Sequence, residues 1–201
     1  LLGILSSQKV GATVADDVTR KAFIAVIISL VVMFVYIAIR FRRWQYGLSS
    51  IICLTHDTLL VIGMYSLFNN ILPFTMEVNQ SFIAAVLTII GYSINNTVVI
   101  FDRVRENVNL FPKKGWKERF NSANNSTLLR TINTSGTTIV VLLAIFIFGG
   151  ETIRGFVFAL LVGMLAGTFS SLFIASPLAY KLFKGKEYDA QLEQVADKKR
   201  K

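Results

Sequence analysis

Five long runs of apolar residues, separated by polar segments, set the pattern of this chain. They cover residues 22–40, 48–68, 80–101, 128–148 and 156–182. Each run approaches or exceeds the roughly 20 helical residues that cross the hydrocarbon core of a bilayer. The pattern therefore predicts an all-α membrane protein with a bundle of five transmembrane helices.

The segments outside these runs differ in composition. Residues 1–21 begin without Met or a basic leader, so we expect the end of an external domain of a longer protein. Residues 102–127 are basic, and within them Trp116 and Phe120 lie four residues apart, which indicates a loop with an interfacial helix. Residues 184–201 end in Lys-Lys-Arg-Lys and are typical of a disordered basic tail.

The distribution of Lys and Arg predicts the orientation. Basic residues follow the first and third runs and fill the tail, whereas the other two loops contain only Arg154. Loops rich in Lys and Arg stay on the cytoplasmic side of a membrane. We therefore expect the segment before the first span to lie outside and the C-terminus to be cytoplasmic.

Composition supports a membrane protein and excludes several other classes. Hydrophobic residues make up 53% of the chain, charged residues 16%, and the mean hydropathy is +0.57. The net charge of +9 lies between apolar runs, so we expect no nucleic-acid partner. One cysteine, Cys53, and one histidine, His56, exclude an internal disulfide and make a zinc site improbable. We expect no metal and no cofactor.

Polar residues inside the apolar runs are the candidate functional residues. Asp57 lies in the second span, Asn95 and Asn96 in the third, and Arg130 and Thr134 in the fourth. An unpaired carboxylate within a membrane costs several kcal/mol, so Asp57 is either functional or paired structurally with a neighbour such as His56. The two asparagines either serve function or only form hydrogen bonds between helices. For Arg130, which lies near a helix end, the alternative to a functional role is that its side chain extends to the lipid headgroups.

Two further patterns predict how the helices pack. Hydroxyl side chains recur every three or four residues in the fourth span, so Thr134 or Ser135 should face the bundle interior together with Asn95, while Phe34 and Phe146 lie nearer the periphery. Small residues recur every four residues in the last span. The expected helix-packing glycines are Gly91, Gly163 and Gly167.

Several motifs together resemble the SecF family of protein-export membrane subunits. The stretch from Gly91 to Glu106 reads Gly-Tyr-Ser-Ile-Asn-Asn-Thr-Val-Val-Ile-Phe-Asp-Arg-Val-Arg-Glu. The other matching motifs are His56-Asp57, Arg40-Phe41, Val10-Gly11 and Arg130-Thr131-Ile132-Asn133-Thr134-Ser135. The resemblance covers about residues 10 to 183.

This resemblance implies an RND-like transmembrane bundle in the inner membrane of a bacterium. It implies a non-enzymatic subunit that works with SecD, either separate or fused, and with the SecYEG channel. Such a subunit assists export of a translocating preprotein by using the proton or sodium motive force. No Gly-x-x-x-x-Gly-Lys-Ser/Thr loop occurs in the chain, so ATP is not the expected energy source.

One residue departs from the family pattern. The motif usually reads Asn-Asp-Thr where this chain has Asn95-Asn96-Thr97. An amide cannot carry a proton, so Asn96 either forms hydrogen bonds only or helps to ligate another ion such as Na⁺. Arg130 then needs another anion, and we favour a carboxylate of SecD over Asp57.

Two other functional classes fit the sequence less well than protein export does. An RND-type exporter of small molecules or lipids would also carry polar residues in mid-membrane, but the motif around Asn95 favours the SecF interpretation. An intramembrane hydrolase needs a nucleophile with a base or a pair of carboxylates, which Asp57 alone does not supply.

Overall fold

The computed structural model describes residues 12–69, 71–74, 76–111 and 113–184. Two predicted segments fall largely outside the described part: residues 1–11 of the expected end of an external domain, and residues 185–201 of the expected tail.

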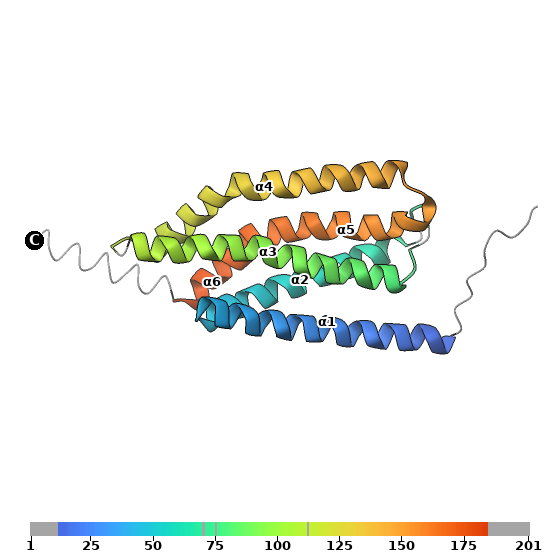
Figure 1. The fold of residues 1–201 in the computed structure, drawn as a ribbon, viewed down its shortest axis with the longest axis horizontal. Helices are drawn as coiled ribbons and strands as arrows, with labels where there is room; N and C mark the ends of the chain where they lie inside the picture. The colour runs from blue at the N-terminus through green and yellow to red at the C-terminus, as the bar shows by residue number, and fades with distance from the viewer. Residues whose placement is uncertain (1–11, 70, 75, 112, 185–201) are drawn as a thin grey trace, which may run out of the picture.

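Helices account for nearly all of the described residues (Figure 1). They are α1 Ala12–Phe41, α2 Trp44–Phe68, α3 Gln80–Leu110, α4 Trp116–Phe148, α5 Glu151–Ser170, the π-helical turn η1 Ser171–Ala175 and α6 Ser176–Leu182. The described part contains five helical segments long and apolar enough to cross a membrane, because α5, η1 and α6 continue as one span. The predicted all-α membrane architecture with five spans is confirmed.

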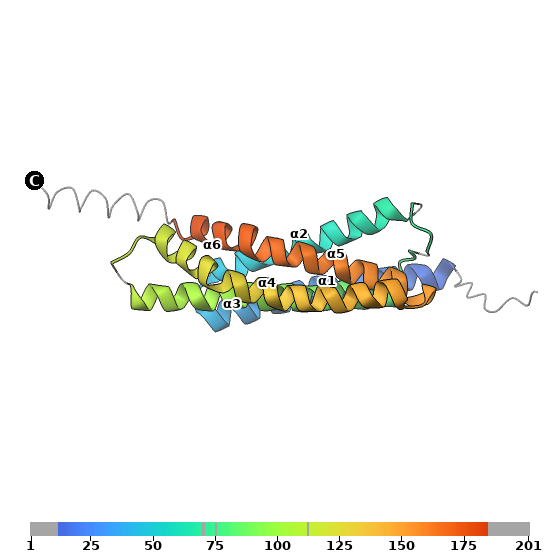
Figure 2. The ribbon, with the colours of Figure 1, turned by 90° about the horizontal axis from the view of Figure 1, so that it is seen from above.

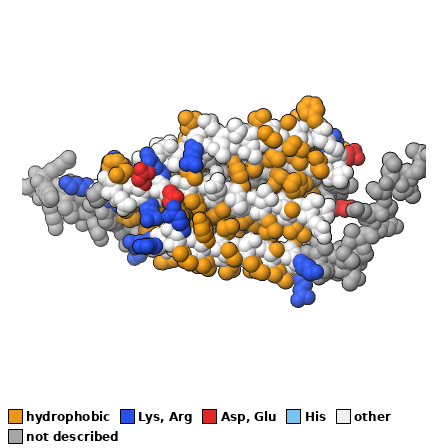
Figure 3. Space-filling model, viewed as in Figure 1, with side chains coloured by type: hydrophobic (Ala, Val, Ile, Leu, Met, Phe, Trp, Pro, Cys, Tyr) orange, Lys and Arg blue, Asp and Glu red, His pale blue; other side chains and the backbone are white. Residues whose placement is uncertain are grey.

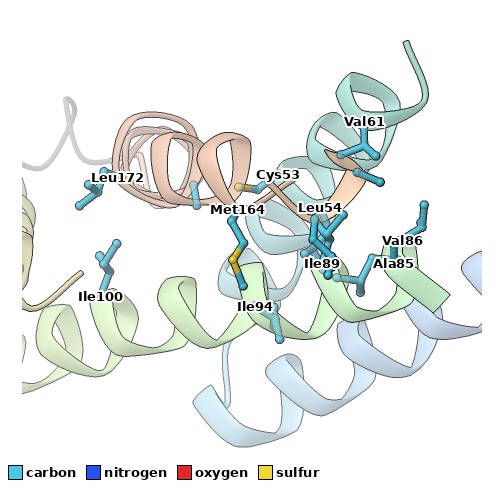
Figure 4. Close-up of a cluster of buried hydrophobic side chains, with 14 of the residues drawn as sticks. Cys53, Leu54, Val61, Ala85, Val86, Ile89, Ile94, Ile100, Met164 and Leu172 are labelled. Carbon is cyan, nitrogen blue, oxygen red and sulfur yellow. The ribbon is translucent and has the colours of Figure 1, made fainter. Parts of the chain in front are cut away.

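Helix α3 lies at the centre of the bundle. It contacts α1, α2, α4 and α5, whereas α1 and α4 form opposite edges (Figures 1 and 2). Buried side chains from α2, α3, α5 and η1 form the core, and Cys53, Leu54, Ile89, Met164 and Leu172 are among them (Figure 4). The core therefore lies between the same three helices, α2, α3 and α5, that carry the buried polar residues described below.

The basic segment 102–127 differs from the prediction of a loop with a separate interfacial helix. Helix α3 continues to Leu110 and α4 already begins at Trp116, so residues 111–115 alone connect them. The extensions pack against each other: Asn107 Nδ2 donates to the Arg119 carbonyl oxygen at 3.1 Å, and Arg119 Nε donates to the Phe111 carbonyl oxygen at 3.2 Å. The charge pattern indicated an interface but could not show that both helices extend through it.

Aromatic rings close the basic end of the bundle. Trp116 at the start of α4 stacks on Phe183 with ring centroids 5.0 Å apart, and Phe183 also lies 4.9 Å from Tyr46. Tyr46 in turn contacts Phe101 at 4.7 Å. One aromatic cluster thus joins the start of α2, the start of α4 and the residue after α6 to Phe101 of α3.

The outer surface of the bundle is largely apolar. Figure 3 shows hydrophobic side chains along the middle of the molecule and Lys and Arg side chains gathered mainly at one end. Large apolar side chains of α1, such as Phe23, Val31 and Ile39, are exposed. Exposure of this kind along a whole helix is expected where lipid, not water, surrounds the protein.

Close contact between α3 and α5 generates a stability prediction. A Cβ atom on Gly163 would overlap the side chain of Ile89, whereas a Cβ atom on Gly91 would meet no atom within 4 Å. Gly163→Ala should therefore lower the free energy of unfolding by about 1–3 kcal/mol through overpacking. Gly91→Ala should leave it unchanged or raise it by up to about 1 kcal/mol through helix propensity.

The measurement is unfolding of both variants in mixed detergent micelles, monitored by circular dichroism. Equal stability of the two variants would contradict the close α3–α5 packing.

Candidate functional site

A buried carboxylate, that of Asp57, joins three helices of the bundle. Asp57 belongs to α2 and is only 1% exposed. The Ser93 hydroxyl of α3 donates to Asp57 Oδ2 at 2.6 Å, and the Ser170 hydroxyl of α5 donates to the same oxygen at 2.8 Å. His56 Nδ1 lies 3.1 Å from the other oxygen, Oδ1. Both carboxylate oxygens therefore have polar partners inside the protein.

These polar contacts compensate for the loss of hydrogen bonds to water that a carboxylate suffers inside a membrane bundle. Hydrogen bonds to a charged acceptor are stronger than those between neutral groups, and a buried charge without them is very costly. The imidazole of His56 is different from the two serines, because its side chain is 40% exposed. His56 thus links the buried Asp57 to the outer face of α2.

Local helix geometry allows the serines to reach Asp57. Gly167 of α5 lies against α3, where an added Cβ would be 3.0 Å from the Ser93 Cβ atom. The π-helical turn η1 begins directly after Ser170. The Asn124 side chain of α4 donates from Nδ2 to the Leu172 carbonyl oxygen within this turn at 3.3 Å. Single π-helical turns inside α-helices frequently occur at functional sites.

A second network of hydroxyl groups connects α3, α4 and α5. The Tyr92 hydroxyl donates to Ser135 Oγ at 3.1 Å, and the Thr168 hydroxyl lies 2.8 Å from the same atom. Ser135 is buried, as the sequence predicted for Thr134 or Ser135.

Asn96 of α3 is also buried, and its Nδ2 atom has no hydrogen-bond partner among the described residues. A buried amide without a partner is uncommon in a native bundle.

Asn95 differs from the prediction that it faces the interior, whereas of the two alternatives Thr134 and Ser135 it is Ser135 that is buried. Asn95 and Thr134 are exposed on the bundle surface. Successive residues of an α-helix are rotated by about 100°, so Asn95 points away from the side of α3 on which Ser93 is buried. For the same reason Thr134 is exposed on α4 although the next residue, Ser135, is buried. Phe34 and Phe146, expected at the periphery, are half-buried.

Arg130 is exposed on α4 and does not contact the Asp57 cluster. No ion pair or hydrogen bond of its side chain is recorded within the described residues. Asn133 and Thr134, three and four residues further along α4, are exposed as well. The structure therefore separates the sequence-predicted polar residues into a buried carboxylate cluster and an exposed polar face.

The predicted packing glycines also divide into two groups. Gly163 and Gly167 lie against Ile89 and Ser93 of α3, whereas Gly91 is exposed and an added Cβ atom there would meet no described atom within 4 Å. Neither Ser93 nor Ser170, the partners of Asp57, stands out in the sequence. The available signal was weak: each is a hydroxyl residue in a mostly apolar run, close to a small-residue contact. Over the described residues, no group of three or more His, Cys, Asp or Glu side chains is placed to hold a metal.

Comparison with known proteins places this arrangement in a family. The model of the family "Protein export membrane protein SecD/SecF, C-terminal" matches residues 2–185. The SecF protein translocase subunit of Rhodothermus marinus is 49% identical over 179 residues, which is 89% of this chain and 58% of that protein. The SecDF protein translocase subunit of Thermus thermophilus is 40% identical over 175 residues, which is 87% of this chain and 23% of that protein.

A solved structure has the same fold. The crystal structure of SecDF in the super-membrane-facing form matches with a TM-score of 0.74 and 38% sequence identity, over 94% of this chain and 24% of that one. The chain spans about half the length of the SecF relatives that it matches. Because the family model covers nearly the whole chain and the bundle matches the membrane region of SecDF, the chain belongs to the SecD/SecF family of protein export membrane proteins.

Proposed function

We propose that this chain is the membrane bundle of a SecF subunit, an accessory of the Sec translocase in the bacterial inner membrane. In this proposal it assists protein export by using the proton or sodium motive force. The names of its relatives, SecF and SecDF protein translocase subunits, support the role. The SecYEG channel, the translocating preprotein and the lipid bilayer are its further partners.

The observation that carries the proposal is an exposed polar surface within the bundle, which we call the polar α3–α4 face. It consists of Asn95, Arg130, Asn133, Thr134 and Thr137, all of them exposed. An arginine that faces lipid at the centre of a membrane helix costs about 2.5–3.5 kcal/mol or more. A partner that offers polar or acidic groups would remove this cost.

SecD, either separate or fused, is the partner that fits this face best. One relative carries the joint name SecDF, and the matched region is only 23% of that protein. A carboxylate of SecD opposite Arg130 would form an ion pair in a low-dielectric environment, which is strongly weakened when the acid is protonated. Protonation of the partner would then loosen the contact between the two subunits.

The energy available is adequate for such a switch. Moving one charge through about 100 mV releases about 2.3 kcal/mol, which shifts a conformational equilibrium by nearly two decades.

Within this chain, Asp57 has a different role in the proposal: it holds α2, α3 and α5 together through Ser93 and Ser170. Asn96, whose buried Nδ2 atom has no hydrogen-bond partner among the described residues, carries no proton.

The first test removes the charge of Arg130. Arg130→Gln keeps a polar side chain but cannot pair with an acid, so the gradient-stimulated rate of export should fall roughly tenfold or more. The measurement is export of a reporter protein into vesicles that contain SecYEG and SecD together with the full-length SecF variant, under an imposed proton or sodium gradient.

Arg103→Gln is the matched control, because Arg103 is a half-exposed arginine paired with Glu106 at 2.6 Å, and such pairs contribute little. A variant Arg130→Gln with full gradient stimulation would remove Arg130 from the coupling site. If the unmodified complex gave no stimulation of protein export, an exporter of small molecules or lipids would become the better interpretation.

The second test compares the two other intramembrane candidates in the same vesicles. Asn96→Asp should leave the driving ion unchanged, because the proton site lies on the partner. Asp57→Asn should lower the free energy of unfolding by about 1–3 kcal/mol, since a neutral amide oxygen accepts the two serine hydrogen bonds more weakly than a carboxylate and the second acceptor oxygen is replaced by an NH₂ donor. The folded fraction of Asp57→Asn should still show gradient stimulation.

Two results would contradict this assignment. A switch of driving ion in Asn96→Asp would place the coupling site at position 96. Loss of stimulation in Asp57→Asn, with an unchanged circular dichroism spectrum, would make Asp57 the proton carrier.

A further inference from the structure

Helix α1, at one edge of the bundle (Figure 1), packs closely against the other helices only near its basic end. Among residues 20–41, the part of α1 whose side chains are described, the buried ones are Ile37 and Phe41. Residues 20–36 are exposed or half-buried, although α1 runs beside α2 and α3. The half of α1 farther from the basic end therefore lacks the close packing of the other half.

A cavity of about 380 Å³ lies between this half of α1 and the helices α2 and α3. Threonines are the only polar residues among the described residues that line it, and the hydroxyl oxygen of one of them, Thr58, is itself buried. The cavity thus presents an almost wholly apolar wall. Its lining includes Val26 and Leu30 of α1, Thr58 and Leu59 of α2, and Phe82 and Val86 of α3.

Water is a poor occupant of such a cavity. A buried water molecule needs two to four polar partners, and cavities lined by apolar side chains remain dry. An empty void is also unfavourable, because the atoms that line it have no contacts on one side. A dry cavity of about 150 Å³ already binds benzene, and this cavity is larger. An apolar ligand is therefore the suitable occupant.

The dimensions of the cavity favour a hydrocarbon chain over a helix of a partner. Along α1 the lining covers residues 22–30, a length of about 12 Å. The mean cross-section is then about 30 Å², less than half that of a helix about 10–12 Å across. Three lining residues, Phe23, Ile27 and Leu59, are also exposed on the outer surface. The cavity is therefore continuous with the apolar surface that faces lipid.

We propose that this cavity, called the acyl-chain cavity below, holds one acyl chain of a membrane phospholipid. Its length of about 12 Å is less than half of the hydrocarbon core of about 30 Å, so the lipid belongs to the leaflet at the end opposite the basic end. Arg20 is exposed two residues before Ala22, and its long side chain would reach the level of that lipid's headgroup. The bound chain supplies the apolar contacts to α2 and α3 that residues 20–36 of α1 do not make themselves.

The test uses a phosphatidylcholine that carries a photoactivatable diazirine near the middle of one acyl chain. This lipid is added in increasing amounts to the delipidated full-length protein in digitonin, a detergent whose rigid fused rings cannot replace a flexible chain. Mass spectrometry then identifies the cross-linked residues. Labelling of Leu30 and Val86, which line the cavity, should saturate near one lipid per protein. Labelling of Val31 and Val35, which are exposed on α1 outside the cavity, should keep rising with the amount of lipid.

Variants that fill the acyl-chain cavity test the assignment. Val26→Phe places a ring inside it and should lower the saturable labelling of Leu30 and Val86 by about fivefold or more, because ring and chain compete for one space. Val31→Phe is the matched control, since it makes the same change on the lipid-facing side of α1 and should lower this labelling less than about twofold. Ala22→Leu adds less volume at one end of the cavity and should lower the labelling about two- to threefold.

Three results would overturn the proposal. Labelling of Leu30 and Val86 that rises without saturation, as expected for Val31, would show exchange with bulk lipid and no site. Absence of label at Leu30 and Val86, with Val31 labelled, would show that the cavity is closed or filled by protein. Full saturable labelling of a natively folded Val26→Phe would place the chain elsewhere. Circular dichroism verifies the fold of each variant, and Ala22→Leu provides the decision if Val26→Phe does not fold.

Discussion

A carboxylate buried among membrane helices must be supplied with hydrogen bonds by the helices around it, and in this bundle that carboxylate is Asp57. Its partners Ser93 and Ser170 come from α3 and α5, so one carboxyl group links three helices and restricts how they are rotated towards each other. Lipid is as apolar as the side chains between the helices, and burial of apolar surface therefore does little to fix these rotations. Polar contacts and close packing provide the specificity.

The close packing between α3 and α5 follows from the same requirement. A Cβ atom on Gly163 would overlap Ile89, and one on Gly167 would lie 3.0 Å from the Ser93 Cβ atom, so these glycines allow the backbone of α5 to approach α3. This approach is consistent with the Ser93 hydroxyl of α3 and the Ser170 hydroxyl of α5 both reaching Asp57 Oδ2. The π-helical turn directly after Ser170 then changes the register of the chain before α6. The two glycines, Ser170 and the π-helical turn thus form one structural unit around the Asp57 carboxylate.

Several polar and charged residues outside this unit lie on the surface, at two different levels of the bundle. The polar α3–α4 face, with Arg130, is within the apolar spans, where a protein partner is the suitable counterpart. Arg43 and Arg105 are exposed at the basic end, where charged lipid is available. For these arginines and for Arg130, no ion pair is recorded within the described residues, and only Arg130 lies within an apolar span, where an unpaired charge is costly.

The sequence alone determined the number and positions of the spans, the basic end and the presence of an intramembrane acid at Asp57, because these depend on composition and on the length of apolar runs. Only the tertiary structure decided which side each residue faces: Asn95 and Thr134 lie outside, Ser135 lies inside, and α3 and α4 continue through the expected loop. The partners of Asp57 are 36 and 113 residues away in the chain, and no local pattern connects them. In helices that are apolar on nearly every side, periodicity does not indicate which side faces the core, and contacts between distant segments decide it.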